Sequence, residues 1–521
     1  MNRDGLAGIR LRFFLVAPLF AAVALFSTGC RKAAPSDATL VAAIPASPLT
    51  LDPRLASDAE GDKISSIICD GLVARTGRLE LAPALAERVE RLSELSWRFH
   101  LREGVLFHDG SPLTADDVVY TYESIRGGKI ASPHKGAYEW IKEVVAEDPL
   151  TVRFDLATPY GPFLSRLTRG IVSKAAAEKA GEAFGRMPVC TGPYRVERFV
   201  PESSVELVAN DGYFGEKPMT RRLHFRVIKD DNVRVLKLMK GDIDLVQNAV
   251  PPMLMGALLK NPELSIESDV GIVMAYMGMN LTDPILKDPK VREAIALTID
   301  RDAIISHRFK GLAVKANSIL SPDNWAYAEN LPQGEYDPAR ARALLDEAGY
   351  PDPDGEGGKP RFTLTFKTST VKERVDTARM IAEQLRAVGI AARVAPYEWA
   401  TFFRDIRRGN FQIYTLSWVG VTEPDIFYEV CHSAQLPPGG LNRGRYANAR
   451  IDELVAEGRF TMDEKRRREV YDEVQKILLR DLPFIPLWYE KNAIVYRKGL
   501  SGVAPRPDAS YRAFVEIGKR P

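Results

Sequence analysis

The sequence predicts an α/β protein of about three domains or lobes. At roughly 150 residues per domain, the 521-residue chain is too long for one ordinary domain. Segments with strand patterns alternate with segments of helical apolar spacing, and no repeat or low-complexity tract is found. Two strand–helix–strand units carry the prediction, at 222–228, 230–239 and 242–246, and at 361–367, 373–388 and 390–394.

In the first half of the chain, a strand and a proline-bounded turn are expected over 40–53, and a helix over 64–73. Apolar and polar residues alternate over 97–101, which predicts another strand. Thr114 and Asp117 have the spacing of a capping box, so a helix should begin between them. Further elements are expected at 151–156, 194–199 and 204–209 (strands) and at 163–167 (helix).

In the second half, two helices share one start signal. Asp288 precedes Pro289, and Asp337 precedes Pro338, which places a capping residue before a proline at the first helical position. The other expected elements are a strand at 271–280, an exposed loop at 351–360, helices at 450–458 and 464–480, and a final strand at 493–496.

The N-terminus has the features of an export signal. A basic segment precedes an uncharged apolar run from Phe13 to Phe26, which is too short to span a bilayer stably. Small residues from Ser27 to Gly29 then precede Cys30, an ending that resembles a bacterial lipobox with Cys30 as the lipidated residue. Ser27 departs from the leucine usual there, and simple cleavage nearby would instead give a soluble exported protein. Residues 30–39 are expected to form a tether.

Charge argues against nucleic acid as a partner. Removal of residues 1–29 leaves 68 basic and 68 acidic residues, and nucleic-acid binding requires a basic surface. No second long apolar segment follows the signal. The mature protein is therefore expected to be exported to the periplasmic or cell-surface side and held to the membrane at Cys30.

Cysteine and histidine spacing supports no metal site and no cofactor. Cys69, Cys190 and Cys431 form no CxxC pair, so export permits one disulfide and leaves one thiol, and most or all should be buried. His100 and His108 have no third ligand at a helpful spacing.

The stretch 411–428 is the candidate ligand contact. It begins as an apolar, β-branched run, breaks at Gly420 into a short polar turn, and resumes as an aromatic run. A strand that ends at such a turn delivers side chains to a surface or cleft, although an ordinary strand–loop–helix connection has the same pattern.

A series of motifs then resembles the bacterial extracellular solute-binding proteins of the peptide and nickel type, family 5. Each motif is weak alone, but their shared order behind an export signal is specific. The motifs are Leu51-Asp-Pro53, Trp97 to Val118 with its core Phe107-His-Asp-Gly110, Thr191-Gly-Pro-Tyr194, Val291-Arg-Glu-Ala with Ile299-Asp-Arg301, Leu344 to Tyr350, and Pro483-Phe-Ile-Pro-Leu487.

The resemblance implies a two-lobed α/β fold of the periplasmic-binding-protein type (class II) with an extra domain and a ligand cleft between the lobes. It implies a monomer that binds a short peptide or related small polar solute and delivers it to the permease subunits of an ABC importer. The implied boundaries are 1–29 signal peptide, 30–39 tether, 40–80, 187–270 and 485–521 domain I, 81–186 domain II, and 271–484 domain III.

The resemblance also implies site residues. Peptide-binding members carry an aspartate after the matching tryptophan that binds the ligand's amino group, and Val421 stands there in this chain. Glu423 and Asp425 are the nearby acids, and for Asp425 we favour a capping role at the next helix. The implied ligand-facing residues are Trp418 as an aromatic platform, Val419, Gly420, Val421, Thr422, Glu423, Asn280 and Trp399, with Arg443, Arg445 and Tyr446 for an anionic ligand end or as a solvated basic loop.

Two other functions are weighed beside this one. A non-transport relative, acting as ligand sensor or chaperone, has the same sequence features. An exported hydrolase is disfavoured because GxSxG, HExxH, P-loop and GxGxxG patterns are all missing from the sequence.

Overall fold

The computed structural model describes residues 36–332, 334–355 and 358–519. The predicted signal peptide, Cys30 and most of the predicted tether lie outside the described residues. The tether prediction was wrong at its C-terminal end, because strand β1 (Ser36–Ile44) begins at Ser36 and pairs along its length with β10 (Thr220–Val227).

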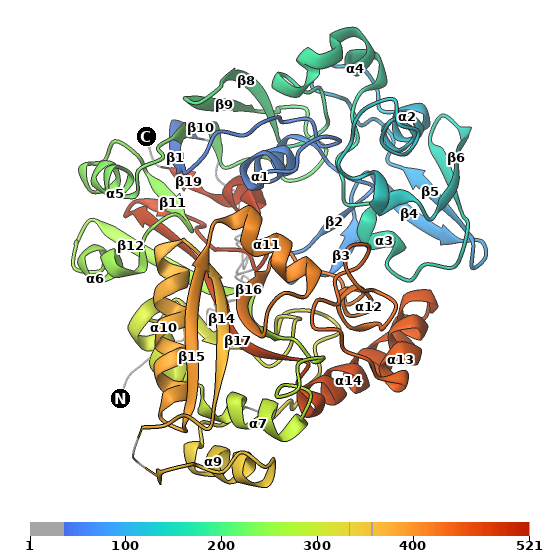
Figure 1. Cartoon of the computed structure of the whole chain (residues 1–521). Helices are drawn as coiled ribbons and strands as arrows, with labels where there is room; N and C mark the ends of the chain where they lie inside the picture. Colours follow the sequence, from blue (N-terminus) through green and yellow to red (C-terminus); the bar gives the residue numbers. More distant parts are fainter. Residues whose placement is uncertain (1–35, 333, 356–357, 520–521) are drawn as a thin grey trace, which may run out of the picture. The chain divides into compact units, whose positions relative to one another are not determined.

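A mixed sheet forms the largest element of the fold (Figure 1). Among the described residues its path runs β15-β14-β16-β12-β17-β11-β1-β10-β9-β8, with β13 beside β17. The strands are β1 (Ser36–Ile44), β8 (Tyr194–Val200), β9 (Ser204–Ala209), β10 (Thr220–Val227), β11 (Leu245–Gln247), β12 (Leu264–Met279), β13 (Ala313–Lys315), β14 (Phe362–Ser369), β15 (Ile390–Tyr397), β16 (Ile413–Trp418) and β17 (Phe484–Arg497).

Both predicted strand–helix–strand units are confirmed. In the first, β10 and β11 lie on either side of β1, all three parallel, with helix α5 (Asp231–Lys240) as the crossover. In the second, β14 and β15 pair in parallel around α10 (Lys372–Arg386). Parallel strands of one sheet cannot be joined by a tight turn, so each pair needs a crossover connection, here a helix.

Strands β12 and β17 are longer than predicted. They pair antiparallel from Leu264 with Arg497 to Gly278 with Phe484. The N-terminal part of β12, residues 265–270, is largely polar and half-buried or exposed, so its apolar pattern gave no strand signal. Partner strands in the sheet, rather than local propensity, extend it.

A separate antiparallel sheet has the order β4-β5-β7-β6. Helix α2 (Ala115–Arg126) contacts β6 and begins where the capping box predicted, with the Asp117 carboxylate accepting a hydrogen bond from Thr114 N at 3.0 Å. The strands of this sheet are β4 (Ala86–Arg91), β5 (Ser96–Leu101), β6 (Ile141–Asp148) and β7 (Thr151–Leu156). The remaining strands form two small sheets, β2 (Val73–Arg75) with β3 (Leu81–Pro83), and β18 (Leu500–Ser501) with β19 (Gly518–Lys519).

The helices agree with the predicted starts at both Asp-Pro signals, whereas the helix expected over 64–73 is displaced. Helix α1 begins at Ala59 and ends at Ile68, because Cys69 adopts an extended backbone. The other helices are α3 (Phe163–Arg166), α4 (Lys174–Ala180), α6 (Met255–Leu258), α7 (Pro289–Thr298), α8 (Arg301–Ile304), α9 (Pro338–Glu347), α11 (Trp399–Arg408), α12 (Ile426–Cys431), α13 (Ala449–Phe460) and α14 (Glu464–Asp481).

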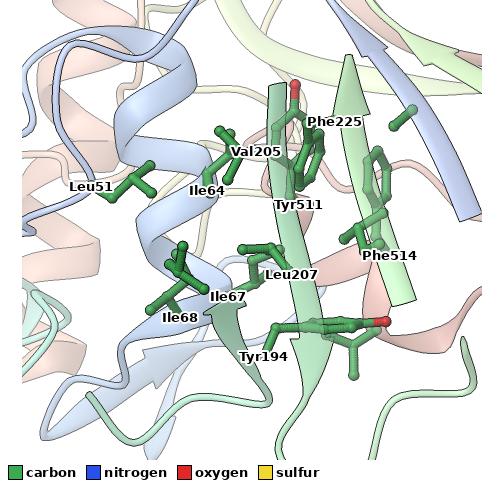
Figure 2. Packing of buried hydrophobic residues seen from close by; sticks show 14 of the residues in the cluster. Leu51, Ile64, Ile67, Ile68, Tyr194, Val205, Leu207, Phe225, Tyr511 and Phe514 are labelled. Atoms are coloured by element: carbon green, nitrogen blue, oxygen red, sulfur yellow. The ribbon is translucent and has the colours of Figure 1, made fainter. Parts of the chain in front are cut away.

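Helix α1 packs one apolar face against strands and aromatic rings from distant parts of the chain. Figure 2 shows Ile64 and Ile67 of α1 beside Val205 and Leu207 of β9, with Tyr511 in the same cluster. Burial of such side chains contributes roughly 1.5–3 kcal/mol each. This cluster fixes the position of α1, whose other residues reach the candidate site.

The cysteines form one disulfide, between Cys69 and Cys190, and both partners are buried. Cys431 is a buried free thiol, and burial raises its pKa. The prediction of buried cysteines with one possible disulfide is confirmed for these three residues.

Candidate functional site

A cavity of about 600 Å³ is built from four segments that lie far apart in the sequence. Its volume falls within the range of roughly 300–1,000 Å³ that is typical of small-molecule sites. The lining residues come from 53–75 around α1 and β2, from 137–170 around α3, from the turn 420–423 after β16, and from 506–512, with Ile272 of β12.

The turn after β16 contributes Gly420, Thr422 and Glu423 to the cavity wall. Gly420 has φ +73°, a left-handed conformation that glycine adopts without the steric cost paid by other residues. Thr422 is held by its carbonyl oxygen, which accepts a hydrogen bond from Asn324 Nδ2 at 3.1 Å. The stretch singled out in the sequence therefore does end at a cavity.

Alternate residues of this turn point away from the cavity. Val419 is 73% exposed, whereas Val421 is 6% exposed and packs in a core cluster with Phe427. The expectation that Val421 faces the ligand in place of an acid was wrong, because the turn at Gly420 directs this side chain into the core.

The two acids of the turn are both bound to arginines. Glu423 forms an ion pair with Arg467 of α14. Asp425 lies at the N-terminal end of α12, but its side chain makes no capping hydrogen bond there, so the favoured capping role was wrong. Its carboxylate lies 3.3 Å from Arg459 instead, and burial raises the pKa of Asp425 to about 6.

Trp418, the last residue of β16, belongs to a column of rings. Its ring stacks on Tyr276 with centroids 5.5 Å apart and an interplanar angle of 6°, and the Arg443 guanidinium lies 4.6 Å from its centroid on a face of the ring. Arg443 also lies 5.4 Å from the ring of Phe403, which stacks on Trp399. Such stacking and cation–π contacts hold the rings of this column in place.

Trp418 lines a smaller hollow of about 20 Å³, together with Arg443 and Tyr446, and none of these three lines the large cavity. Tyr446 donates a hydrogen bond to Asp481 Oδ2 at 2.6 Å. Arg443 donates to Tyr276 Oη at 2.8 Å.

Three further expected site residues have packing roles or lie at the surface. The Asn280 amide donates to the carbonyl oxygens of Gly409 and Phe411 at 3.2 and 3.1 Å. Arg445 donates to backbone carbonyls, among them that of Arg443 at 3.2 Å. Trp399 is 49% exposed at the start of α11. None of the three lines the large cavity.

Sequence reasoning missed the basic residues of the cavity. An arginine at the end of a short strand or helix does not indicate a binding site, because arginines at such positions usually lie on the solvated surface. Only the packing of distant segments brings them together. They are Arg75, Arg166, Arg169, Arg506 and Arg512, joined by Lys63 of α1.

The part of the chain that the structure describes contains no group of three His, Cys, Asp or Glu residues arranged to hold a metal ion. Its helices also fall short of the length and apolar character that a bilayer crossing requires.

Comparison with known proteins gives a consistent picture. A family model described as "Bacterial extracellular solute-binding proteins, family 5 Middle" matches residues 80–435. A probable di/tripeptide-binding protein 5 of Pseudomonas aeruginosa is 30% identical, with 83% of this chain and 86% of that protein covered.

Two solved structures are similar over nearly the whole chain. HbpA2 from Haemophilus parasuis is 27% identical with a TM-score of 0.83, and the match covers 93% of this chain and 100% of that one. The oligopeptide-binding protein AppA from Bacillus subtilis, in complex with a nonapeptide, is 27% identical with a TM-score of 0.74, covering 94% and 100%.

Proposed function

The chain belongs to family 5 of the bacterial extracellular solute-binding proteins and has their two-lobed fold, and from this premise we propose that it captures a short peptide or related small polar solute for an ABC importer. One observation carries the proposal. The cavity of about 600 Å³ is lined by segments near residues 70, 166, 422 and 510, so a bound solute would touch parts of the chain that no local element joins. Such a site desolvates its ligand on several sides and selects it by hydrogen bonds.

Titration of the exported chain tests this proposal. Intrinsic tryptophan fluorescence and thermal unfolding would be followed with panels of peptides, sugars, opines and metal chelates. A ligand that binds the folded state raises its stability according to its concentration relative to the dissociation constant. At least one class should raise the unfolding temperature, and no response to any class would contradict the proposal.

The side chains proposed to meet the solute directly are Thr422 and Glu423, in the turn that follows the end of β16 at Trp418. We expect Trp418→Ala to weaken solute binding, because the stack of Trp418 on Tyr276 holds the end of β16, from which the cavity-lining turn at Gly420 continues. Trp418→Phe is the matched control, since a smaller ring can still stack. Unchanged affinity in Trp418→Ala would show that the stack of Trp418 on Tyr276 does not position the site.

Delivery to a permease is the second half of the proposal. The family's members are extracellular solute-binding proteins, and the lipobox-like ending at Cys30 would keep this one at the membrane as a lipid-anchored monomer. We expect Cys30→Ser to move the protein from the membrane fraction to the soluble exported fraction without loss of solute binding. Retention of the variant in membranes would argue against lipidation at Cys30.

A further inference from the structure

The walls of the large cavity carry an excess of positive charge. Six cationic side chains line it against three carboxylates, an excess of three positive charges. The cations are Lys63, Arg75, Arg166, Arg169, Arg506 and Arg512, and the carboxylates are Asp62, Glu423 and Asp508.

Most of these charges are already matched within the protein. Four of the six cations have a carboxylate within 4.0 Å, and Glu423 is bound to Arg467 outside the lining set. The four pairs are Lys63–Glu60, Arg169–Asp62, Arg506–Glu516 and Arg512–Asp70.

Arg75 and Arg166 differ from the other four. Within the part of the chain that the structure describes, neither has a carboxylate within 4.0 Å. Arg75 donates to the Leu79 carbonyl oxygen at 3.3 Å, and Arg166 donates to Tyr160 Oη at 3.2 and 3.3 Å. Both residues are half-buried, so their charge is held against the cavity without a carboxylate in direct contact.

The two arginines line the same cavity, so their like charges oppose one another. Burial lowers the pKa of Arg75, and the charge of Arg166 lowers it further, while Glu423 and Asp508 oppose the change. Arginine stays ionised at neutral pH nonetheless. A ligand with two anionic groups would relieve both the repulsion and the incomplete neutralisation.

Asp508 is the complementary group. It lines the same cavity, and among the described residues it has no basic side chain within 4.0 Å. One of its oxygens, Oδ1, accepts a hydrogen bond from Ser510 N at 2.9 Å. Its carboxylate therefore forms no ion pair with a described residue.

We propose that the preferred solute of this site is an acidic dipeptide or a closely related short acidic peptide, with one ammonium and at least two carboxylates. Arg75 and Arg166 bind the carboxylates, and Asp508 accepts from the ammonium group. Planar guanidinium groups suit carboxylates because they donate two parallel hydrogen bonds. This inference rests on the proposed function and narrows its substrate class.

Four small probes test the inference on the unmutated chain by isothermal titration calorimetry. Ala-Glu and Ala-Gln have the same shape and differ in one charge, Ala-Lys reverses that charge, and N-acetyl-Ala-Glu lacks the ammonium group. Loss of a charged hydrogen-bond partner typically weakens binding about 10- to 100-fold. We expect Ala-Glu to bind more tightly than each of the other three probes by a factor in that range.

Variants assign the preference to residues. Arg75→Gln and Arg166→Gln should reduce the ratio of Ala-Glu to Ala-Gln affinity toward one, and Asp508→Asn should do the same for the ratio of Ala-Glu to N-acetyl-Ala-Glu. Arg153→Gln is the matched control, because Arg153 lies on β7 beside Asp155 and does not line the cavity. It should leave both ratios unchanged.

The outcomes distinguish failure of the acidic preference from failure of the solute-binding function. Equal or tighter binding of Ala-Gln or Ala-Lys overturns the acidic preference and leaves the solute-binding function standing. Binding of none of the four probes, with a response to another solute class, also overturns the preference. No response to any solute overturns both. The probe comparison needs no mutation, so a variant that fails to fold does not affect it.

Discussion

Burial of the Asp425 carboxyl should make the stability of this fold depend on pH. The side chain is 2% exposed, and burial raises its pKa from the ordinary 3.8 to about 6. Arg459, at 3.3 Å, and Arg166 favour the charged form and oppose the shift, whereas Glu423 and Glu429 add to it. Because the net shift is upward, desolvation outweighs the ion pair.

The magnitude follows from this shift. About two pKa units correspond to about 3 kcal/mol at roughly 1.4 kcal/mol per unit. A raised pKa means that the folded state holds the proton more tightly than the unfolded state. The contribution to stability is therefore complete below about pH 4 and is lost as the pH rises through about 6. In Asp425→Asn the side chain is neutral throughout, so this contribution no longer varies.

Urea unfolding between about pH 4 and pH 8 measures the effect. The unfolding free energy of the natural chain minus that of Asp425→Asn should fall by about 3 kcal/mol over this range. Asp116→Asn, at an exposed site on α2, is the control for the loss of a surface charge. A difference that stays flat, or that rises with pH, would refute the reasoning, because the ion pair with Arg459 would then outweigh burial.

Two further predictions concern tight packing and covalent linkage. A Cβ added at Gly161 would lie 2.6 Å from the Thr461 carbonyl oxygen, so Gly161→Ala should lower the unfolding free energy by about 1–3 kcal/mol. Gly77→Ala is the control, because nothing lies within 4 Å of a Cβ added there, and it should leave the unfolding free energy unchanged. Equal urea midpoints for the two variants would contradict this prediction. Replacing both Cys69 and Cys190 by serine opens a link across 121 residues and should cost about 2–5 kcal/mol in thermal or urea unfolding, and an unchanged transition would show that the link adds no stability.

Local chemistry explains which elements could be predicted from the sequence. Helix α7 begins at Pro289, as expected, because Asp288 Oδ1 accepts a hydrogen bond from Lys290 N at 2.8 Å. The signal lies entirely within a few residues, so no distant contact is needed to read it. The same holds for the turn at Gly420, whose position next to a cavity was anticipated from a strand that stops abruptly.

Long-range packing explains what was missed. Residues 265–270 of β12 are polar, and only their pairing with β17 makes them a strand. Val421 was placed at the ligand by correspondence with related sequences, but its orientation depends on the conformation of the glycine before it. Arg75 and Arg166 are 91 positions apart along the chain, and no spacing rule connects them.

The order of strands in the large sheet also affects how the chain must fold. Strand β11 lies between β1, from the beginning of the described chain, and β17, from near its end. Until residues 484–497 are in place, β11 and β12 each lack the neighbour that β17 provides. Pairings of such long sequence separation are slow to form, and open strand edges attract other chains. Completion of this sheet is therefore a late event, and fragments that end before Phe484 should aggregate.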